Sequence, residues 1–405
     1  MDKKINLYFF GELGVYDEYN PAYVCNREFV PYILYLIAYN EPFCISKKEI
    51  IKTLKINEEE FSYIINGLDR IKAIEIKRDK YKLNFPVFLE DDIPLLDKHF
   101  SNIGKIIGDK IIENRKVIYE KISRLSNYPY FSKERLLYHV ICDDIFDGIA
   151  FDFFEEKNIF SPHRNQPGNR DYIIFGYEDN KRVERYSDKI LCSSNNYDSK
   201  SFVFNSFGDS NGVRKDMFRF FNKVEKTLEG TTLFKDLNLA YIKVIEEKNR
   251  EIAEKCGGLI WKSFRNEIDY YELNDTEKNL VHFLIQIGYL NIDKTNYIVS
   301  CNVPVFQYSD REIIHEVSDI ILNDIYIIVK TIFDDFSKEA IELTAIKHKV
   351  NIKEIAIELW HQVFGLTNEY LAEIGFVESP KYIEEEGRYL RSFSIKNYND
   401  RKVYI

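Results

Sequence analysis

The 405-residue chain carries 56 Lys and Arg against 66 Asp and Glu, a net charge of −10, which excludes a uniformly basic nucleic-acid coat protein. Its 45% hydrophobic and 15% aromatic content excludes a disordered chain and is enough for about two to four folded domains. Only 17 Gly and 10 Pro are present, which disfavours a loop-rich all-β sandwich.

The six cysteines are widely scattered and form no CxxC pair, so we expect neither a zinc site nor a disulfide framework. No apolar run is long enough to span a membrane, and the first residues contain no long apolar segment. These patterns predict a cytoplasmic protein without a membrane partner.

The region from Cys25 to Phe88 has the clearest local pattern. Apolar residues at helical spacing predict a helix over 27–40. Ser46-Lys47-Lys48-Glu49 is a capping box, and Asn57-Glu58-Glu59-Glu60 resembles one, so two further helices are expected to begin there. Residues 74–85 alternate on both sides of a polar tip, which predicts a hairpin. Three helices followed by a hairpin is the order of a winged helix.

A sequence repeat extends this pattern along the chain. Pro86-Val87-Phe88 recurs as Pro304-Val305-Phe306, an offset of 218 residues, and the same offset aligns 86–162 with 304–380 without a gap. At an offset of 217, the predicted caps Ser46 and Asn57 meet Ser263 and Asn274. Chance matching is the alternative, because identity is low; we interpret the repeat as a duplicated fold.

Each half is then expected to contain a second unit of the same type. In the first half, helices over 103–125 and 133–157 precede a hairpin with strands at 172–177 and 182–186 and a turn between them. In the second half, a helix ending at 371–377 precedes a strand at 389–395, a turn at 397–400 and a return strand at 402–405.

The segments between these units have weaker patterns. Residues 187–212 have loop composition with a short strand at 201–207. Residues 216–256 read as mostly helical with a break near Gly230, and alternating apolar residues at 5–9 indicate an edge strand.

We therefore predict a mainly α fold with small β-hairpins (α+β), built from tandem winged-helix-like units in two unit–helix–unit repeats. The expected segments are an N-terminal segment (1–24), winged helix 1 (25–88), a linker helix with unit 2 (89–186), a linker or insertion (187–234), winged helix 3 (235–306) and a linker helix with unit 4 (307–405). Because one chain would hold duplicate heads, a monomer could imitate a two-fold dimer.

Enzyme motifs are missing from the sequence. None of GxxxxGK[ST], GxGxxG, HExxH or GxSxG occurs, so we expect no catalytic residue and no cofactor. His139 and Asp143, with Asp144 and Asp147 nearby, could supply metal ligands on one helix face. We favour the alternative, a solvated acidic helix turn with one partly buried histidine, and expect no metal.

Nucleic-acid contact is the sharper hypothesis, because short cationic clusters occupy predicted hairpin tips. These candidate phosphate contacts are Lys77, Arg78 and Lys80 in unit 1, Lys181, Arg182 and Arg185 in unit 2, and Arg401 and Lys402 in unit 4. The alternative is that hairpin tips must be polar in any case.

The predicted helix at 58–70 has an outward face that could read base edges through Ser62, Tyr63, Asn66 and Arg70. Glu58, Glu59 and Glu60 at its start oppose phosphates, so we expect only some units to touch DNA. Further polar candidates are Lys278, Asn279, His282 and Gln286 in unit 3, and His361, Gln362, Thr367 and Asn368 in unit 4.

Aromatic residues cluster in units 2 and 4, around Phe146, Phe154, Trp360 and Phe364. They could line a small-molecule pocket, but aromatic residues at helical spacing more often form the core. We interpret them as core.

The caps at Ser46 and Asn57, the hairpin at 74–85 and the C-terminal Ile374-Gly375-Phe376 ending resemble the winged-helix superfamily, in the broad style of bacterial MarR and ArsR regulators. The resemblance implies a transcription regulator that binds double-stranded DNA, with the third helix in the major groove and the wing on the backbone or minor groove. The acidic balance and the fourfold layout depart from simple repressors. The alternative function is therefore a winged-helix scaffold that binds a protein partner without contacting DNA.

Overall fold

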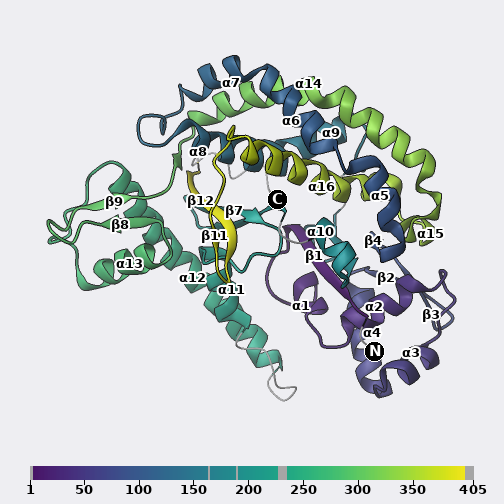
Figure 1. Cartoon of the computed structure of the whole chain (residues 1–405). Coiled ribbons are helices and arrows are strands. Elements are labelled where there is room, and N and C mark those ends of the chain that lie inside the picture. Colours follow the sequence, from purple (N-terminus) through teal and green to yellow (C-terminus); the bar gives the residue numbers. More distant parts are fainter. Residues whose placement is uncertain (1–2, 163–164, 188–189, 227–234, 397–405) are drawn as a thin grey trace. The chain divides into compact units, whose positions relative to one another are not determined.

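The computed structural model describes residues 3–162, 165–187, 190–226 and 235–396 (Figure 1). It is 53% helical and 17% strand, an α+β mix with several small sheets. The chain forms two compact units, each assembled from three segments. From here on, unit 1 and unit 2 mean these compact units and not the four winged-helix-like units expected from the sequence. Unit 1 comprises Met1–Ile107, Phe151–Asp188 and Ile325–Phe364, and unit 2 comprises Gly108–Ala150, Lys189–Asp324 and Gly365–Ile405.

Unit 1 begins with a strand, a set of short helices and a hairpin. These elements are β1 (Ile5–Glu12), α1 (Pro21–Cys25), α2 (Val30–Tyr39), α3 (Lys47–Leu54), α4 (Glu58–Arg70), β2 (Ile74–Lys77), β3 (Lys80–Leu83), β4 (Val87–Phe88), the 3₁₀ turn η1 (Glu90–Asp92), α5 (Ile93–Phe100) and the start of α6 (Ile103–Glu113). Its later segments add α9 (Ala150–Glu156), β5 (Asp171–Glu178), α10 (Lys181–Ser187), the second part of α14 (Asp310–Glu339), η4 (Ala340–Glu342), α15 (Thr344–Lys347) and most of α16 (Ile352–Glu373).

The sheet of unit 1 has the order β1-β5-β4. Strand β5 pairs antiparallel with β1, as in Leu7 with Gly176, and parallel with the short β4, as in Val87 with Gly176. The edge strand expected at 5–9 is thus confirmed as β1. The core beneath the helices is mainly aliphatic and includes Ile33, Leu34 and Ile50, all without exposed surface.

The local predictions for residues 27–85 are confirmed. Pro31 lies in the first turn of α2, Ser46 and Glu49 form the capping box of α3, and Asn57 caps α4. Strands β2 and β3 then pair in register from Ile74 with Leu83 to Lys77 with Lys80. Figure 1 shows α2, α3, α4 and this hairpin grouped together.

Unit 2 contains three strands of eight or nine residues and a 30-residue helix, Lys235–Phe264. Its elements are the rest of α6, α7 (Arg115–Ile122), α8 (Lys133–Leu137), the π-helix η2 (Tyr138–Ile149), β6 (Leu191–Asp198), β7 (Phe202–Asp209), α11 (Met217–Lys226), α12 (Lys235–Phe264), α13 (Asp275–Gln286), β8 (Leu290–Ile292), β9 (Val299–Cys301), β10 (Val305–Phe306), the first part of α14, the end of α16, β11 (Tyr382–Ile383) and β12 (Gly387–Ile395).

The sheet of unit 2 has the order β10-β12-β7-β6, with β11 paired to β12. Strand β12 pairs antiparallel with β7 and parallel with β10, just as β5 pairs with β1 and β4. In unit 1 the Gly176 amide donates to the Pro86 carbonyl at 3.0 Å, and in unit 2 the Phe393 amide donates to the Pro304 carbonyl at 2.9 Å. The recurrence of Pro86 at Pro304 therefore marks a local correspondence between the two sheets.

The prediction of four winged-helix-like units in two repeats is wrong. Residues 182–186 do not return as a strand but lie in α10, because the Asn180 side chain accepts from the Arg182 amide and starts a helix that buries Val183 and Tyr186. The strand at 172–177 pairs with β1 and β4, and the strand at 389–395 pairs with β7 and β10. The return strand expected at 402–405 and the turn at 397–400 lie outside the described residues.

Two further expectations fail for identifiable reasons. In residues 187–212, expected to be a loop with a short strand at 201–207, that strand is present as β7, but residues 191–198 form the unexpected strand β6. The polar residues of β6 have partners such as Asp216, whose Oδ2 accepts from Asn195 Nδ2. Ser263, aligned with the Ser46 cap, is buried near the end of α12 and donates to the Val299 carbonyl. The proposed helix break near Gly230 lies outside the described residues. The expectation of a two-headed monomer depended on the repeat and is not retained.

Helical residues 103–125 and 133–157 are confirmed in outline. The first stretch is divided at Asn114 between α6 and α7, and the second contains the π-helix between α8 and α9. Across the part of the chain that the structure describes, no helix is both long enough and apolar enough to cross a membrane.

Two glycines of unit 2 give a stability test of the sheet. A Cβ on Gly208 in β7 would come within 2.0 Å of the Arg388 carbonyl oxygen, whereas a Cβ on Gly258 in α12 would meet no atom within 4 Å. We expect Gly208→Ala to lower the free energy of unfolding by about 2 kcal/mol or more, because the backbone of β12 must move. Gly258→Ala should raise it by about 1 kcal/mol through helix propensity. Urea denaturation measures both, and equal effects of the two substitutions would contradict the close packing of β7 on β12.

Candidate functional site

The strongest candidate site is a cationic surface on α3 and the β2–β3 hairpin of unit 1. Helix α3 begins at a capping box in which Ser46 Oγ accepts from the Glu49 amide and Glu49 Oε2 accepts from the Ser46 amide at 2.8 Å. This start is tied to the hairpin, because the Lys47 amide donates to the Asp79 carbonyl at 3.1 Å. The first turn of α3 therefore lies beside the hairpin tip.

The hairpin tip has a defined conformation. Arg78 and Asp79 both have positive φ, 51° and 57°, between the closing pair Lys77 and Lys80. Two consecutive left-handed residues are the geometry of a type I′ turn, which matches the twist of a two-residue hairpin. Buried Tyr81 anchors the tip, and its carbonyl accepts from the Phe43 amide at 2.9 Å.

Five exposed cations share this region, and we call them the basic hairpin surface. They are Lys48 and Lys52 on α3, and Lys77, Arg78 and Lys80 on the hairpin. Within the described residues none of the five forms an ion pair, whereas Lys47 pairs with Glu58 and Lys82 with Glu75. Lysines 48 and 52 were not among the predicted contacts. Their spacing of four residues on a capped helix was the signal for a shared exposed face.

The outward face of α4 is only partly available for contact. Ser62 Oγ donates to the Glu58 carbonyl at 2.7 Å, and the Arg27 guanidinium lies 4.0 Å from the Tyr63 ring centroid. Arg70 lies 5.9 Å over the Tyr19 ring. Asn66 is exposed and has no hydrogen-bond partner among the described residues. Asn66 is therefore the α4 side chain best placed to reach a base edge.

The other predicted cationic tips are not hairpin tips in the structure. Lys181 and Arg182 are exposed on α10, and Arg182 pairs with Glu90 at 3.1 Å. Arg185 belongs to the same helix, but its side chain lies outside the described set. Arg401 and Lys402 are outside the described residues. Among the described residues, Lys77, Arg78 and Lys80 are thus the only predicted cations that lie together at a hairpin tip.

The four polar residues that the sequence suggested as DNA contacts in the predicted fourth winged-helix-like unit are buried. His361, Gln362, Thr367 and Asn368 lie on α16 with at most 2% of their surface exposed. In unit 1, Gln362 Nε2 donates to the Tyr177 hydroxyl at 3.0 Å, and that hydroxyl donates to Glu358 Oε1. In unit 2, Asn368 Nδ2 donates to the Leu191 carbonyl. These side chains stabilise the interior and cannot contact a ligand at the surface.

The aromatic clusters are core, as interpreted from the sequence. Phe146, Phe154, Trp360 and Phe364 have no exposed surface. In unit 1, Phe154 and Trp360 meet edge to face with ring centroids 4.8 Å apart.

The His139 region of unit 2 differs from the solvated turn that we favoured. His139 and Asp143 lie on the π-helix η2 and are 1% and 5% exposed, with Nδ1 and Oδ2 3.9 Å apart. Burial lowers the pKa of His139 and raises the pKa of Asp143, whose Oδ2 accepts from Asn205 Nδ2 at 2.6 Å. Burial also raises the pKa of Asp144 to about 7. Among the described residues no three His, Cys, Asp or Glu side chains converge as a metal site.

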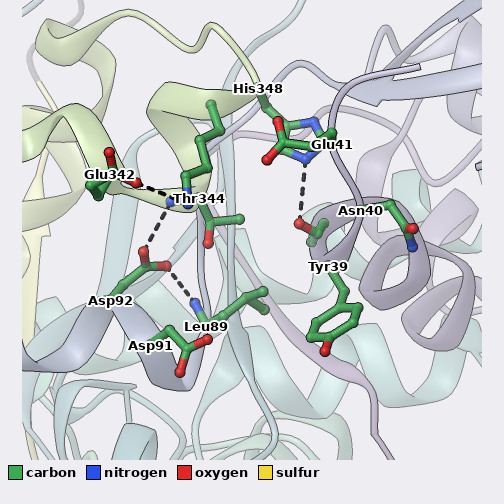
Figure 2. Close-up of a pocket in the computed structure, with 11 residues that line it drawn as sticks. Tyr39, Asn40, Glu41, Leu89, Asp91, Asp92, Glu342, Thr344 and His348 are labelled. Atoms are coloured by element: carbon green, nitrogen blue, oxygen red, sulfur yellow. Dashed lines mark hydrogen bonds and ion pairs between the residues drawn. The ribbon is translucent and has the colours of Figure 1, made fainter. Parts of the chain in front are cut away.

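Unit 1 also contains a small polar cavity of about 110 Å³ between the end of α2, η1 and α15 (Figure 2). Figure 2 shows the buried Asp92 carboxylate accepting from the Leu89 and Thr344 amides, at 2.7 and 2.9 Å. Burial raises the pKa of Asp92. The volume is well below the roughly 300–1,000 Å³ of small-molecule pockets, so this cavity does not support an effector site.

His348 on the wall of this cavity connects three elements. Its Nδ1 accepts from the Leu83 amide of β3 at 3.2 Å, so Nε2 carries the proton. Nε2 faces the Ala38 carbonyl at 3.4 Å, the contact marked by the dashed line at His348 in Figure 2. The neutral imidazole thereby joins the hairpin to α2 and α15. Sequence reasoning missed this role, because the residues that it joins are hundreds of positions apart.

Comparison with family models, curated proteins and solved structures finds no match for this chain. The assignment of function therefore depends on the residues and geometry described above.

The environment of His348 predicts a loss of stability in mild acid. Desolvation by burial lowers its pKa from 6.5, despite opposing hydrogen bonds to the Ala38 and Asn40 backbone. The charged and titratable groups around it are Glu41, Lys82, Asp92, Glu342 and Lys347. Because the folded state holds the neutral imidazole, its contribution is complete above pH 6.5 and is lost as the pH falls below that value, by up to about 1 kcal/mol near pH 5.5.

The comparison variant is His348→Gln, which keeps one acceptor and one donor but does not titrate. Urea denaturation of both proteins at about pH 7.5 and pH 5.5 should show the smaller acid-induced loss in the variant. His139, whose pKa is also lowered, contributes equally to both proteins and cancels in the difference. Identical losses in wild type and variant would contradict the assigned role of His348.

Proposed function

We propose that the chain binds double-stranded DNA through the basic hairpin surface and acts in the regulation of transcription. The observation that carries the proposal is the group of five exposed cations without ion pairs, held at a type I′ turn and the capped start of α3. Lysine and arginine side chains in such a group suit phosphate contacts, which position a protein on the duplex.

The overall charge of −10 does not oppose this proposal, because the charge balance is local. Between Cys44 and Phe85 the sequence has ten Lys and Arg against seven Asp and Glu. Exposed charges farther away than the Debye length, about 8 Å at physiological salt, are largely screened from a bound phosphate. The acidic residues of the rest of the chain therefore weaken the attraction only slightly.

The acidic start of α4 limits which elements can approach phosphates. Glu58 is neutralised by Lys47 at 3.1 Å, but Glu59 is exposed and has no ion pair within the described residues. We therefore assign the phosphate contacts to α3 and the hairpin, and the base-edge contact on α4 to Asn66. Asparagine can bond adenine through both its amide oxygen and its amide nitrogen.

Replacement of Lys77, Arg78 and Lys80 by Ala should weaken binding to every duplex by a similar factor. Each lost phosphate contact removes about 0.9 from the slope of log affinity against log salt, so the slope should fall by about two to three. Fluorescence anisotropy with two unrelated duplexes, between about 50 and 200 mM salt, measures both quantities. Stability should change little, because these side chains are exposed.

A charge-matched control separates this surface from the net charge of the chain. Lys243, Lys255 and Lys262 are exposed on α12 in unit 2, and their triple Ala variant removes the same charge. We expect that control to bind duplex DNA as the wild type does. Equal weakening in both variants would remove the hairpin from the binding surface. No duplex binding by the wild type at micromolar concentration would refute the proposal and leave the protein-binding scaffold as the function.

Asn66→Ala tests the base-edge contact separately. Loss of this side chain should reduce discrimination among duplex sequences by about 1–3 kcal/mol at one position, while the salt slope stays that of the wild type. Selection from a randomised duplex library, applied to wild type and variant, gives the two preferences. The same preference in both would show that α4 does not enter a groove.

A further inference from the structure

A cluster of three tyrosines projects from unit 2, and we call it the tyrosine cluster. Tyr270 and Tyr271 lie in the loop between α12 and α13, and Tyr297 lies in the loop between β8 and β9. The rings of Tyr270 and Tyr297 are stacked with centroids 5.4 Å apart, and Tyr271 lies 5.5 Å from Tyr297. Tyr271 is 69% exposed and Tyr297 is 42% exposed, so the cluster forms an aromatic surface outside the core.

The cluster is held rigidly. The Tyr270 hydroxyl lies 3.0 Å from His282 Nε2. The β8–β9 loop is closed by two backbone bonds, from the Asp293 amide to the Ile298 carbonyl and from the Tyr297 amide to the Asp293 carbonyl. Rings that are fixed before binding lose little conformational entropy when a partner arrives.

The backbone of Tyr297 is an independent sign that this aromatic ring has a use. Its φ is +56°, a left-handed conformation that Gly or Asn adopts more easily than a bulky residue does. Tyr297 is 42% exposed and does not belong to the hydrophobic core of unit 2, so core packing does not explain why a tyrosine stands here. Strained positions of this kind cluster at binding surfaces.

Acidic residues lie beside the tyrosines, and one cation of the chain, Lys278, lies over the Tyr270 ring with its Nζ 5.7 Å from the centroid. Asp269 and Glu272 flank Tyr270 and Tyr271 in sequence, and Asp293 closes the loop of Tyr297. All three are exposed, and none forms an ion pair within the described residues; Asp269 and Asp293 each accept one backbone amide bond. Between Arg265 and Ile298 the sequence has six Asp and Glu against three Lys and Arg. This balance is opposite in sign to that around the basic hairpin surface.

Aromatic faces ringed by carboxylates match cationic side chains. A guanidinium or ammonium can lie over a tyrosine ring and pair with a neighbouring carboxylate, whereas a phosphate would be repelled. Tyrosine is also enriched at the centres of protein interfaces. We propose that the tyrosine cluster is a docking surface for a protein segment that carries exposed arginine or lysine side chains. This proposal is independent of DNA binding and can stand if that function fails.

The test uses the full chain and a fluorescein-labelled hexa-arginine peptide in fluorescence anisotropy, with hexa-glutamate and a twelve-residue oligo-dT as comparison probes. The variant Tyr271→Ser/Tyr297→Ser should bind hexa-arginine at least fivefold more weakly than the wild type. The control Tyr241→Ser/Tyr382→Ser removes two other exposed tyrosines of unit 2, 53% and 65% exposed, and should bind as the wild type does. Hexa-glutamate should bind the wild type and the Tyr271→Ser/Tyr297→Ser variant equally, because an anionic peptide is attracted to the basic hairpin surface and not to the tyrosine cluster.

A second pair of variants separates the acidic ring from the net charge. Asp269→Asn/Asp293→Asn keeps the acceptors of the two loop bonds and should weaken hexa-arginine binding at least threefold. Glu247→Gln/Asp319→Asn neutralises two exposed carboxylates elsewhere in unit 2 and should not. Equal weakening by both pairs, or equal binding by the wild type and the tyrosine variant, would overturn the proposal.

Two other occupants give distinct outcomes, each of which also overturns the proposal. If the wild type binds oligo-dT and the tyrosine variant does not, the surface stacks nucleic-acid bases. If sedimentation shows a wild-type dimer that the tyrosine variant loses, the occupant is a second copy of this chain. A further variant, Tyr297→Asn, separates loss of binding from misfolding. Asparagine adopts the left-handed conformation more easily than tyrosine, so the melting temperature of this variant should equal or exceed that of the wild type. Its binding of hexa-arginine should nevertheless be weaker.

Discussion

The sheet of each unit depends on a central strand that comes later in the sequence than the two strands on either side of it. In unit 1 the amide of Gly176 donates to the carbonyl of Pro86, and in unit 2 the amide of Phe393 donates to the carbonyl of Pro304. Proline has no amide hydrogen, so its carbonyl is its only backbone group for sheet pairing. These bonds attach the two-residue strands β4 and β10, and with them the hairpins that precede each strand, to the main sheets. Without β5 and β12, the helix–hairpin segments would lose this strand pairing and keep contacts through side chains, such as the bond from the Leu83 amide to His348 and the bond from Ser263 to the Val299 carbonyl.

This dependence explains which parts of the fold were predictable. Capping boxes, helical spacing and hairpin tips report contacts within a few residues, and the predictions at Ser46, Asn57 and 74–83 are confirmed for that reason. The pairing of β5 with β1 joins residues about 170 positions apart, and the sequence of neither strand indicates which strand it pairs with. The segment 172–186 was therefore given a nearby return strand. In the structure a helix begins after Asn180 instead, because the side chain and the carbonyl of Asn180 accept hydrogen bonds from the first amides of α10.

The candidate site shows the same division. Exposed cations at a hairpin tip can be predicted from the local pattern, since a tip is exposed in almost any fold. Lys48 and Lys52 were missed because only the Lys47–Asp79 backbone bond reveals that α3 begins beside that tip. Conversely, His361 and Gln362 have the polarity of surface residues but lie in the interior, where Gln362 donates to the Tyr177 hydroxyl and His361 Nδ1 lies 3.5 Å from Glu358. Polarity indicates that a side chain needs a partner, and the sequence alone does not say whether that partner is water, a ligand or another part of the chain.

The two helix–hairpin segments, α4 with β2–β3 and α13 with β8–β9, share an order of elements but carry surfaces of opposite charge. Folding does not require this separation, because an exposed unpaired charge or ring contributes little to stability. Solubility does not require it either, since a net charge of −10 opposes self-association wherever the two signs lie along the chain. What the separation does provide is selectivity. Carboxylates beside the tyrosines repel the phosphates that the lysines of the first segment attract, and those lysines in turn repel a basic peptide. Under the two proposals, an anionic partner is therefore directed to the first surface and a cationic partner to the second.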